Sequence, residues 1–206
     1  MSFAAIYTTL SSPAVSVHIV YLTVILIALM GFRFTALYVG LMPLINWSFG
    51  AVPTLPIPDW AGGGAFQPLA IVTGLVMVVR DFAQRETKHW IFAAMMAGLL
   101  LSTLTSWITV VFASGAAFLI SETVDWAVYT FSNRPFSQRV LISSLASAPL
   151  DQIVFIWLAS FVAPGIFALG TVLTGIASKL LGAWVISMLM ARRERQEARC
   201  VPVPAT

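Results

Sequence analysis

The chain has 206 residues, of which 59% are hydrophobic and only 9% are charged, and its formal net charge is +3. Soluble domains carry about 25% charged residues, so this composition excludes a water-soluble globular protein. The basic residues form short clusters between apolar runs rather than one basic face, which argues against nucleic-acid binding. A chain of this length is expected to form one polytopic membrane domain.

Residue types that support other chemistries are scarce. Cys200 is the only cysteine, so a disulfide within the chain and a cysteine-based metal site are both excluded. His18 and His89 lack ligand-spaced partners, and the Gly62–Gly64 run is not followed by the Lys-Ser/Thr of a phosphate loop. With no nucleophile–base pair in the sequence either, we expect no metal, no cofactor and no enzymatic activity.

Seven apolar runs follow one another along the chain, and helices are the only spanning element expected for them. Most runs approach the ~20 residues needed to cross ~30 Å of hydrocarbon. Only Gly31, Phe32 and Arg33 separate the first two, so a tight hairpin and one long kinked helix both remain open. The runs cover residues 14–31, 34–51, 65–80, 90–110, 113–131, 139–162 and 167–190.

These runs predict an all-α bundle with six core transmembrane helices in residues 34–191. Residues 1–33 form an N-terminal extension with an additional transmembrane helix, and the basic residues 192–206 are predicted to form a disordered cytoplasmic tail. Between the second and third runs, residues 52–64 are rich in proline and glycine, which predicts an extended external loop rather than a helix.

The basic residues predict how the bundle lies in the membrane. Under a seven-span arrangement, ten of the eleven fall on one side, and Lys179 is the exception. The positive-inside rule makes that side cytoplasmic, which places the C-terminus inside the cell. The ten residues are Arg33, Arg80, Arg85, Lys88, Arg134, Arg139, Arg192, Arg193, Arg195 and Arg199.

Three charged residues, Glu122, Asp151 and Lys179, lie near the midpoints of the last three runs. A charge at the centre of a spanning helix costs roughly 2.5–3.5 kcal/mol on insertion scales, so a functional reason is expected for each. Asp125 shares a helix face with Glu122, and Gln152 follows Asp151. The pattern predicts a polar pocket halfway across the bilayer, although a buried ion-pair network that only joins helices is the alternative.

A guanine-type ring suits such a pocket, because one carboxylate can accept its N1–H and its exocyclic amine together. Lys179 or Gln152 would then supply a donor to the ring carbonyl. Trp126 is a candidate for stacking, with a lipid-facing position as the alternative. Asn46 and Gln67 could line an entrance or could simply join helices.

Two polar features accompany these candidates. Ser121 to Asp125 and Ser147 to Asp151 share the pattern Ser-x-x-aliphatic-Asp, which either reflects two halves of one site or arises by chance. Arg80, Asp81 and Arg85 end the third run, where a gate of salt bridges and a solvated loop are equally open.

The segment from Gly64 to Arg85, the two Ser-x-x-aliphatic-Asp segments and Lys179 together resemble the VUT group of queuosine-precursor transporters. The resemblance covers roughly residues 34–190. Two positions depart from that pattern, since Ala148-Pro149 and Gly74 stand where members of the group often carry Asn and Asp.

The resemblance implies a multi-pass protein of the bacterial inner membrane that imports a 7-deazaguanine such as preQ0 or preQ1. A substrate-binding subunit of an energy-coupling-factor vitamin importer is the alternative, and a homodimer remains open. In this reading Glu122, Asp125 and Asp151 accept the N–H donors of the base or carry a coupling proton. Gln152 and Lys179 serve the ring carbonyl or neutralise the acids. The expected partners are thus a deazapurine base and the lipid bilayer.

Overall fold

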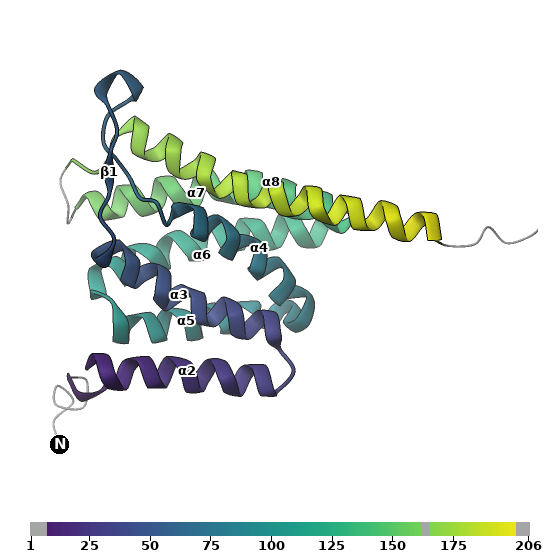
Figure 1. Ribbon diagram of the computed structural model, residues 1–206, viewed down its shortest axis with the longest axis horizontal. Helices are drawn as coiled ribbons and strands as arrows, with labels where there is room; N and C mark the ends of the chain where they lie inside the picture. Colours follow the sequence, from purple (N-terminus) through teal and green to yellow (C-terminus); the bar gives the residue numbers. More distant parts are fainter. Residues whose placement is uncertain (1–7, 162–164, 201–206) are drawn as a thin grey trace, which may run out of the picture.

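The computed structural model describes residues 8–161 and 165–200. The chain runs back and forth along one axis as a bundle of helices (Figure 1). This confirms the predicted all-α fold. The helices are α2 (Pro13–Leu29), α3 (Arg33–Ala51), α4 (Ala70–Thr87), α5 (Ile91–Thr105), α6 (Ile108–Phe131), α7 (Phe136–Ser160) and α8 (Leu169–Cys200), with 3-10 turns η1 (Asp59–Ala61) and η2 (Lys88–Trp90) and strands β1 (Leu55–Pro56) and β2 (Ala65–Phe66).

The two ends of the bundle differ in chemistry. We call one the basic end, because Arg33, Arg85, Lys88, Arg134 and the arginines after Ala191 lie there, and the other the loop end, because it carries the β1–β2 hairpin (Figure 1). Successive helices run in opposite directions, so successive connections lie at opposite ends. A bundle of helices suits a membrane, since each helix satisfies its backbone polar groups internally.

Helices α2 and α3 form a tight hairpin rather than one kinked helix. Gly31 has a φ of +93°, a conformation that side chains with a Cβ rarely adopt, and this residue reverses the chain. Helix α2 then lies at the edge of the bundle against α3 (Figure 1). Its outer face exposes Leu22, Leu26 and Leu29, as expected for contact with lipid.

Three described helices, α6, α7 and α8, are long and apolar enough to cross a membrane by length and composition. Helix α2 is apolar but has 17 residues. A multi-pass membrane bundle is therefore established, whereas seven spans remain a prediction.

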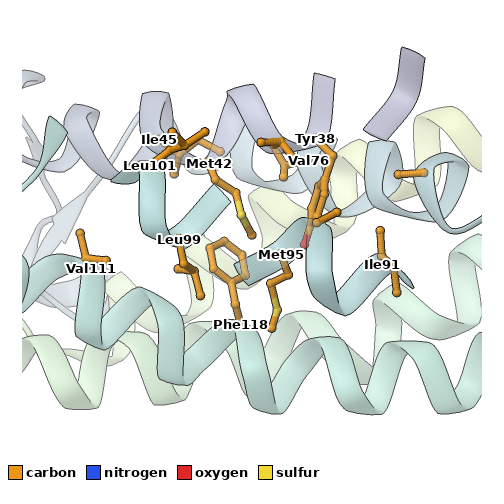
Figure 2. Close-up of a cluster of buried hydrophobic side chains, with 13 residues drawn as sticks. Tyr38, Met42, Ile45, Val76, Ile91, Met95, Leu99, Leu101, Val111 and Phe118 are labelled. Carbon is orange, nitrogen blue, oxygen red and sulfur yellow. The ribbon is translucent and has the colours of Figure 1, made fainter. Parts of the chain in front are cut away.

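The hydrophobic core fills the space between α3, α4, α5 and α6 (Figure 2). Met42 and Met95 occupy its centre, where their flexible side chains fit between branched neighbours. This packing fixes α3 and α5 against the helices that carry the charged residues. The labelled core residues are Tyr38, Met42, Ile45, Val76, Ile91, Met95, Leu99, Leu101, Val111 and Phe118.

The loop of residues 52–64 is extended except for the short 3-10 turn η1, and its strand β1 pairs antiparallel with β2, which directly follows the loop. It docks on the first turn of α8. The Gly170 N–H donates to the Gly62 carbonyl at 3.1 Å, and the Ala65 N–H donates to Thr171 Oγ1 at 2.9 Å. Through these hydrogen bonds, the loop that leads into α4 also holds the start of α8.

Helices α4 and α8 cross at very short range. A Cβ on Gly74 would lie 2.6 Å from the Lys179 Cα, so only glycine fits at this position without displacing α8. An aspartate therefore has no space at residue 74 in this chain.

Helix α8 extends further than predicted. The sequence predicted a disordered tail from residue 192, but the structure continues the helix through Cys200. The physical reason is a contact with the first turn of α7: Glu194 accepts the Ser137 N–H at 3.1 Å and the Ser137 hydroxyl at 2.7 Å. Residues 201–206 lie outside the described part of the chain.

Candidate functional site

Six charged side chains from four helices meet inside the bundle. We call this group, Arg80 and Asp81 of α4, Glu122 and Asp125 of α6, Asp151 of α7 and Lys179 of α8, the charge cluster. Each side chain is at most 6% exposed. Isolated buried charges are costly, and each cation of the cluster accordingly contacts at least one carboxylate.

Arg80 is the centre of the cluster. Its Nε donates to Glu122 Oε2, and its Nη1 donates to Asp125 Oδ2 and, at 3.2 Å, to Asp81 Oδ1. The Nη2 donates to the Glu122 backbone carbonyl at 3.1 Å. One guanidinium thus contacts three carboxylates, a geometry for which its rigid fork of donors is suited.

The location of Arg80 corrects the prediction. A solvated loop is wrong for Arg80 and Asp81, which are both fully buried. The predicted apolar run ended at Arg80, its first charged residue. Helix α4 continues to Thr87, so Arg80 lies two turns before the end of the helix. The signal was present in the spacing, because Met77, Arg80, Asp81 and Gln84 repeat at helical intervals on one face.

Arg85 does not belong to the cluster. It is exposed at the basic end, and its guanidinium stacks over the Phe136 ring at 4.4 Å. The predicted gate of Arg80, Asp81 and Arg85 therefore separates into a buried pair and a surface residue.

The second ion pair joins Lys179 to Asp151. Around the two pairs, the Ser-x-x-aliphatic-Asp segments exchange hydrogen bonds across α6 and α7. Ser121 donates to Asp151 Oδ1 at 3.3 Å, and Ser147 donates to Asp125 Oδ1 at 3.4 Å. Each segment therefore places its serine on the aspartate of the other.

Gln152 and Trp126 lie beside the cluster rather than in it. The Gln152 amide donates to the Thr171 carbonyl at 3.4 Å, towards the loop end. The Trp126 indole donates to His89 at 3.3 Å and packs edge-on against Phe92, so it faces the basic end and α5. Stacking of Trp126 on a ligand held by the cluster would require a rearrangement.

Asn46 and Gln67 lie nearer the loop end. Gln67 donates to the Ser48 carbonyl at 3.1 Å. The amide nitrogen and oxygen of Asn46 are buried and have no hydrogen-bond partner among the described residues. An unpaired buried amide costs about 1–3 kcal/mol for each group, which is unusual unless something else binds there.

Asn46 contributes to the wall of a cavity of about 460 Å³ at the loop end. Its volume is within the ~300–1,000 Å³ range of small-molecule sites. Phe49 of α3 and Phe155 of α7 both line it, with ring centroids 4.7 Å apart. Phe155 lies one helical turn after Asp151 on α7. The cavity is lined by Asn46, Trp47, Phe49, Ala51, Thr105, Ser106, Trp107, Thr109, Val110, Ala113, Phe155, Ala159 and Ile166.

The cluster can bind ligands that donate hydrogen bonds, since its carboxylates outnumber its cations. No group of three or more His, Cys, Asp or Glu within residues 8–161 and 165–200 is arranged to hold a metal ion. Ionised residues inside a membrane bundle characteristically mark substrate or ion pathways. The fold and the site together define the class: a multi-pass membrane transporter.

The chain belongs to a family described as "putative vitamin uptake transporter", whose model matches residues 63–192. The matched segment contains the whole charge cluster, whereas α2 and α3 lie before it. No curated protein and no solved structure matches the chain. Membership in this family confirms the predicted membrane transporter.

Proposed function

We propose that this protein imports a queuosine precursor, a 7-deazaguanine such as preQ0 or preQ1, across the bacterial inner membrane. In this proposal the basic end faces the cytoplasm. The observation that carries it is the convergence of Arg80, Asp81, Glu122, Asp125, Asp151 and Lys179 from four helices in the interior of an apolar bundle.

The hydrogen-bond chemistry supports a guanine-type ligand. The N1–H and exocyclic amine of the base form an N–C–N donor edge, the same shape as the Nε–Cζ–Nη2 edge that Arg80 presents to the Glu122 carboxylate and the Glu122 backbone carbonyl. A single carboxylate of the cluster can accept both donors of such an edge. Bases without the exocyclic amine would leave a carboxylate oxygen unpaired, which provides discrimination.

The path of the ligand follows from the closed state of the cluster. Since each cluster side chain is at most 6% exposed, the bundle must open before a base can reach it. The base would first occupy the loop-end cavity beside Asn46, and then pass Phe49 and Phe155 towards Asp151. A later opening at the basic end would release it, with the ligand favouring one state through differential contacts.

The test is rescue of queuosine in tRNA. Cells that lack their own importer and cannot make the precursor would express the protein and receive preQ0, preQ1 or queuine. We expect restoration by at least one base, and a loss of about tenfold or more in uptake for Asp151→Asn, in line with one lost charged hydrogen bond. Asp59→Asn, at an exposed carboxylate on the loop end, is the matched control.

Absence of rescue by all three bases, with the protein present in the membrane, would refute this substrate class. Rescue only when separate ATPase and scaffold subunits are supplied would instead identify a substrate-binding subunit. Full rescue by a well-folded Asp151→Asn variant would assign the cluster to helix packing alone.

A further inference from the structure

The cluster contains more acid than base. Within residues 8–161 and 165–200, the buried carboxylates are Asp81, Glu122, Asp125 and Asp151, and the buried cations are Arg80 and Lys179. If all were ionised, two negative charges would remain uncompensated in the bundle interior. A dry, apolar environment makes that state expensive, and neutralisation by a proton is the usual response.

The hydrogen-bond geometry locates the deficit at Asp81 and Asp125. The Nη1 atom of Arg80 has two N–H groups, yet it faces three acceptors: Asp81 Oδ1 at 3.2 Å, Gln84 Oε1 at 2.8 Å and Asp125 Oδ2. Asp81 Oδ2 has no hydrogen-bond partner in the part of the chain that the structure describes. One donor is therefore missing between these two carboxyl groups.

An independent observation comes from α3. The Tyr38 hydroxyl is fully buried and also has no hydrogen-bond partner among the described residues. It lies within electrostatic range of Arg80, Glu122, Asp125 and Asp151. The Tyr38 hydroxyl, on a separate helix, thus lies near the cluster and is able to form a further hydrogen bond.

The remaining charged and titratable neighbours are already committed. Glu122 accepts from Arg80 Nε, and Asp151 accepts from Lys179 on α8. From α6, Tyr129 approaches Asp81, with Arg139 of α7 over its ring and Arg85 of α4 nearby. Among the buried carboxylate oxygens of the described residues, only Asp81 Oδ2 has no hydrogen-bond partner.

We propose that Asp81 and Asp125 share a coupling proton, and that one proton enters the cell with each molecule of base. This inference rests on the proposed function. A cluster without the proton resists closure, because closure would bury two surplus charges. A proton on the carboxyl pair removes one of them, and the donor edge of the base compensates another carboxylate, so the doubly loaded protein closes most readily.

The experiment uses purified full-length protein in liposomes with labelled preQ0, a neutral base. Exchange is measured with unlabelled preQ0 inside at equal pH, and net accumulation is measured with an alkaline interior. One pH unit sets a limit of about tenfold accumulation for one proton per base. We expect wild-type protein to approach this limit, and a protonophore to abolish accumulation without affecting exchange.

In Asp81→Asn the rate of exchange serves as the reference, and gradient-driven accumulation measured against that rate is expected to fall from about tenfold to none. Asp81→Glu, which keeps a carboxyl group and guards against misfolding of the first variant, should retain accumulation. Asp59→Asn is the matched control, since its carboxylate is exposed at the loop end, and it should behave as wild type.

The outcomes separate the two proposals. Exchange of preQ0 without any response to the pH gradient, or with a response to a sodium gradient instead, overturns proton coupling and leaves the transport function intact. Failure of wild-type protein to exchange labelled preQ0 and, in a repeat of the experiment, labelled preQ1 and labelled queuine overturns both. If Asp81→Asn accumulates preQ0 as well as wild type does, the coupling proton is not shared by Asp81 and Asp125, and this assignment is overturned.

Discussion

At the scale of single residues, the site depends on how a few long side chains distribute their donors. Arg80 contacts Asp81, Glu122 and Asp125 at once, whereas Lys179 contacts Asp151. Removing one member of a buried pair leaves an uncompensated charge, which is far more destabilising than removing the whole pair. Replacing Arg80 is therefore expected to have a different effect on stability from replacing Lys179.

Replacement of Arg80 with glutamine should destabilise the protein severely. Three carboxylates would lose their cation, and a cost of about 3–5 kcal/mol follows from broken buried pairs in other proteins. Thermal unfolding of the purified protein in detergent measures the effect. Arg85→Gln, on the same helix but exposed, should change stability by less than about 1 kcal/mol, and equal effects of both variants would contradict the central role of Arg80.

The Lys179–Asp151 pair offers a double-mutant test. Lys179→Met alone and Asp151→Asn alone should each lower the unfolding temperature in detergent, because each leaves its partner charged and buried. The combination should recover most of the lost stability, with a coupling energy of about 1–3 kcal/mol. Strictly additive effects would show that the two groups do not depend on each other in the folded protein.

Most of the cluster was predictable from hydropathy, but the burial of Arg80 and Asp81 was not. Glu122, Asp151 and Lys179 interrupt long apolar runs, so their burial follows from the cost of charge in lipid. Arg80 lies at the end of an apolar run, where a charge usually marks the membrane surface. Its inward reach depends on the length of its side chain and on the course of α4 to Thr87, neither of which hydropathy reports.

At the scale of helices, contacts between small residues determine the position of the charges. Gly74 of α4 lies against the Lys179 backbone of α8. Close approach through glycine is a common means of packing membrane helices. The distance between these two helices in turn allows Lys179 to reach Asp151 on the neighbouring α7.

Gly74→Ala should therefore reduce both stability and uptake. The added methyl would force α4 and α8 apart, and overpacking of this kind costs about 1–3 kcal/mol. Uptake of a labelled base and thermal unfolding in detergent measure the two effects. Gly115→Ala on α6 is the matched control, because the nearest atom to its Cβ would be Leu99 Cδ1 at an ordinary 3.4 Å.

The extension of α8 should depend on Glu194. This carboxylate satisfies the Ser137 N–H and hydroxyl at the start of α7, where helical backbone donors have no partner in their own helix. Glu194→Ala should cost about 1 kcal/mol, as other lost N-terminal caps do. Limited trypsin cleavage at Arg192, Arg193 and Arg195 should accelerate, while the exposed control Gln196→Ala leaves the rate unchanged.

At the scale of the whole molecule, the distribution of charge predicts the orientation of the bundle in the membrane. Arg33, Arg85, Lys88, Arg134 and the arginines beyond Ala191 lie at one end, and the β1–β2 hairpin lies at the other (Figure 1). Lys179 does not weaken this asymmetry, since Asp151 neutralises it inside the bundle. By the positive-inside rule we expect the basic end to lie in the cytoplasm.

The single cysteine allows a direct test of this orientation. A membrane-impermeant maleimide should label Cys200 only after cells are permeabilised, because the end of α8 should lie inside the cell. In a Cys200→Ser background, Asp59→Cys at the loop end should react in intact cells, and Cys200→Ser alone should not react at all. Labelling of Cys200 in intact cells would invert the bundle. The loop-end cavity would then open to the cytoplasm, and a path of import that begins beside Asn46 would have to be abandoned.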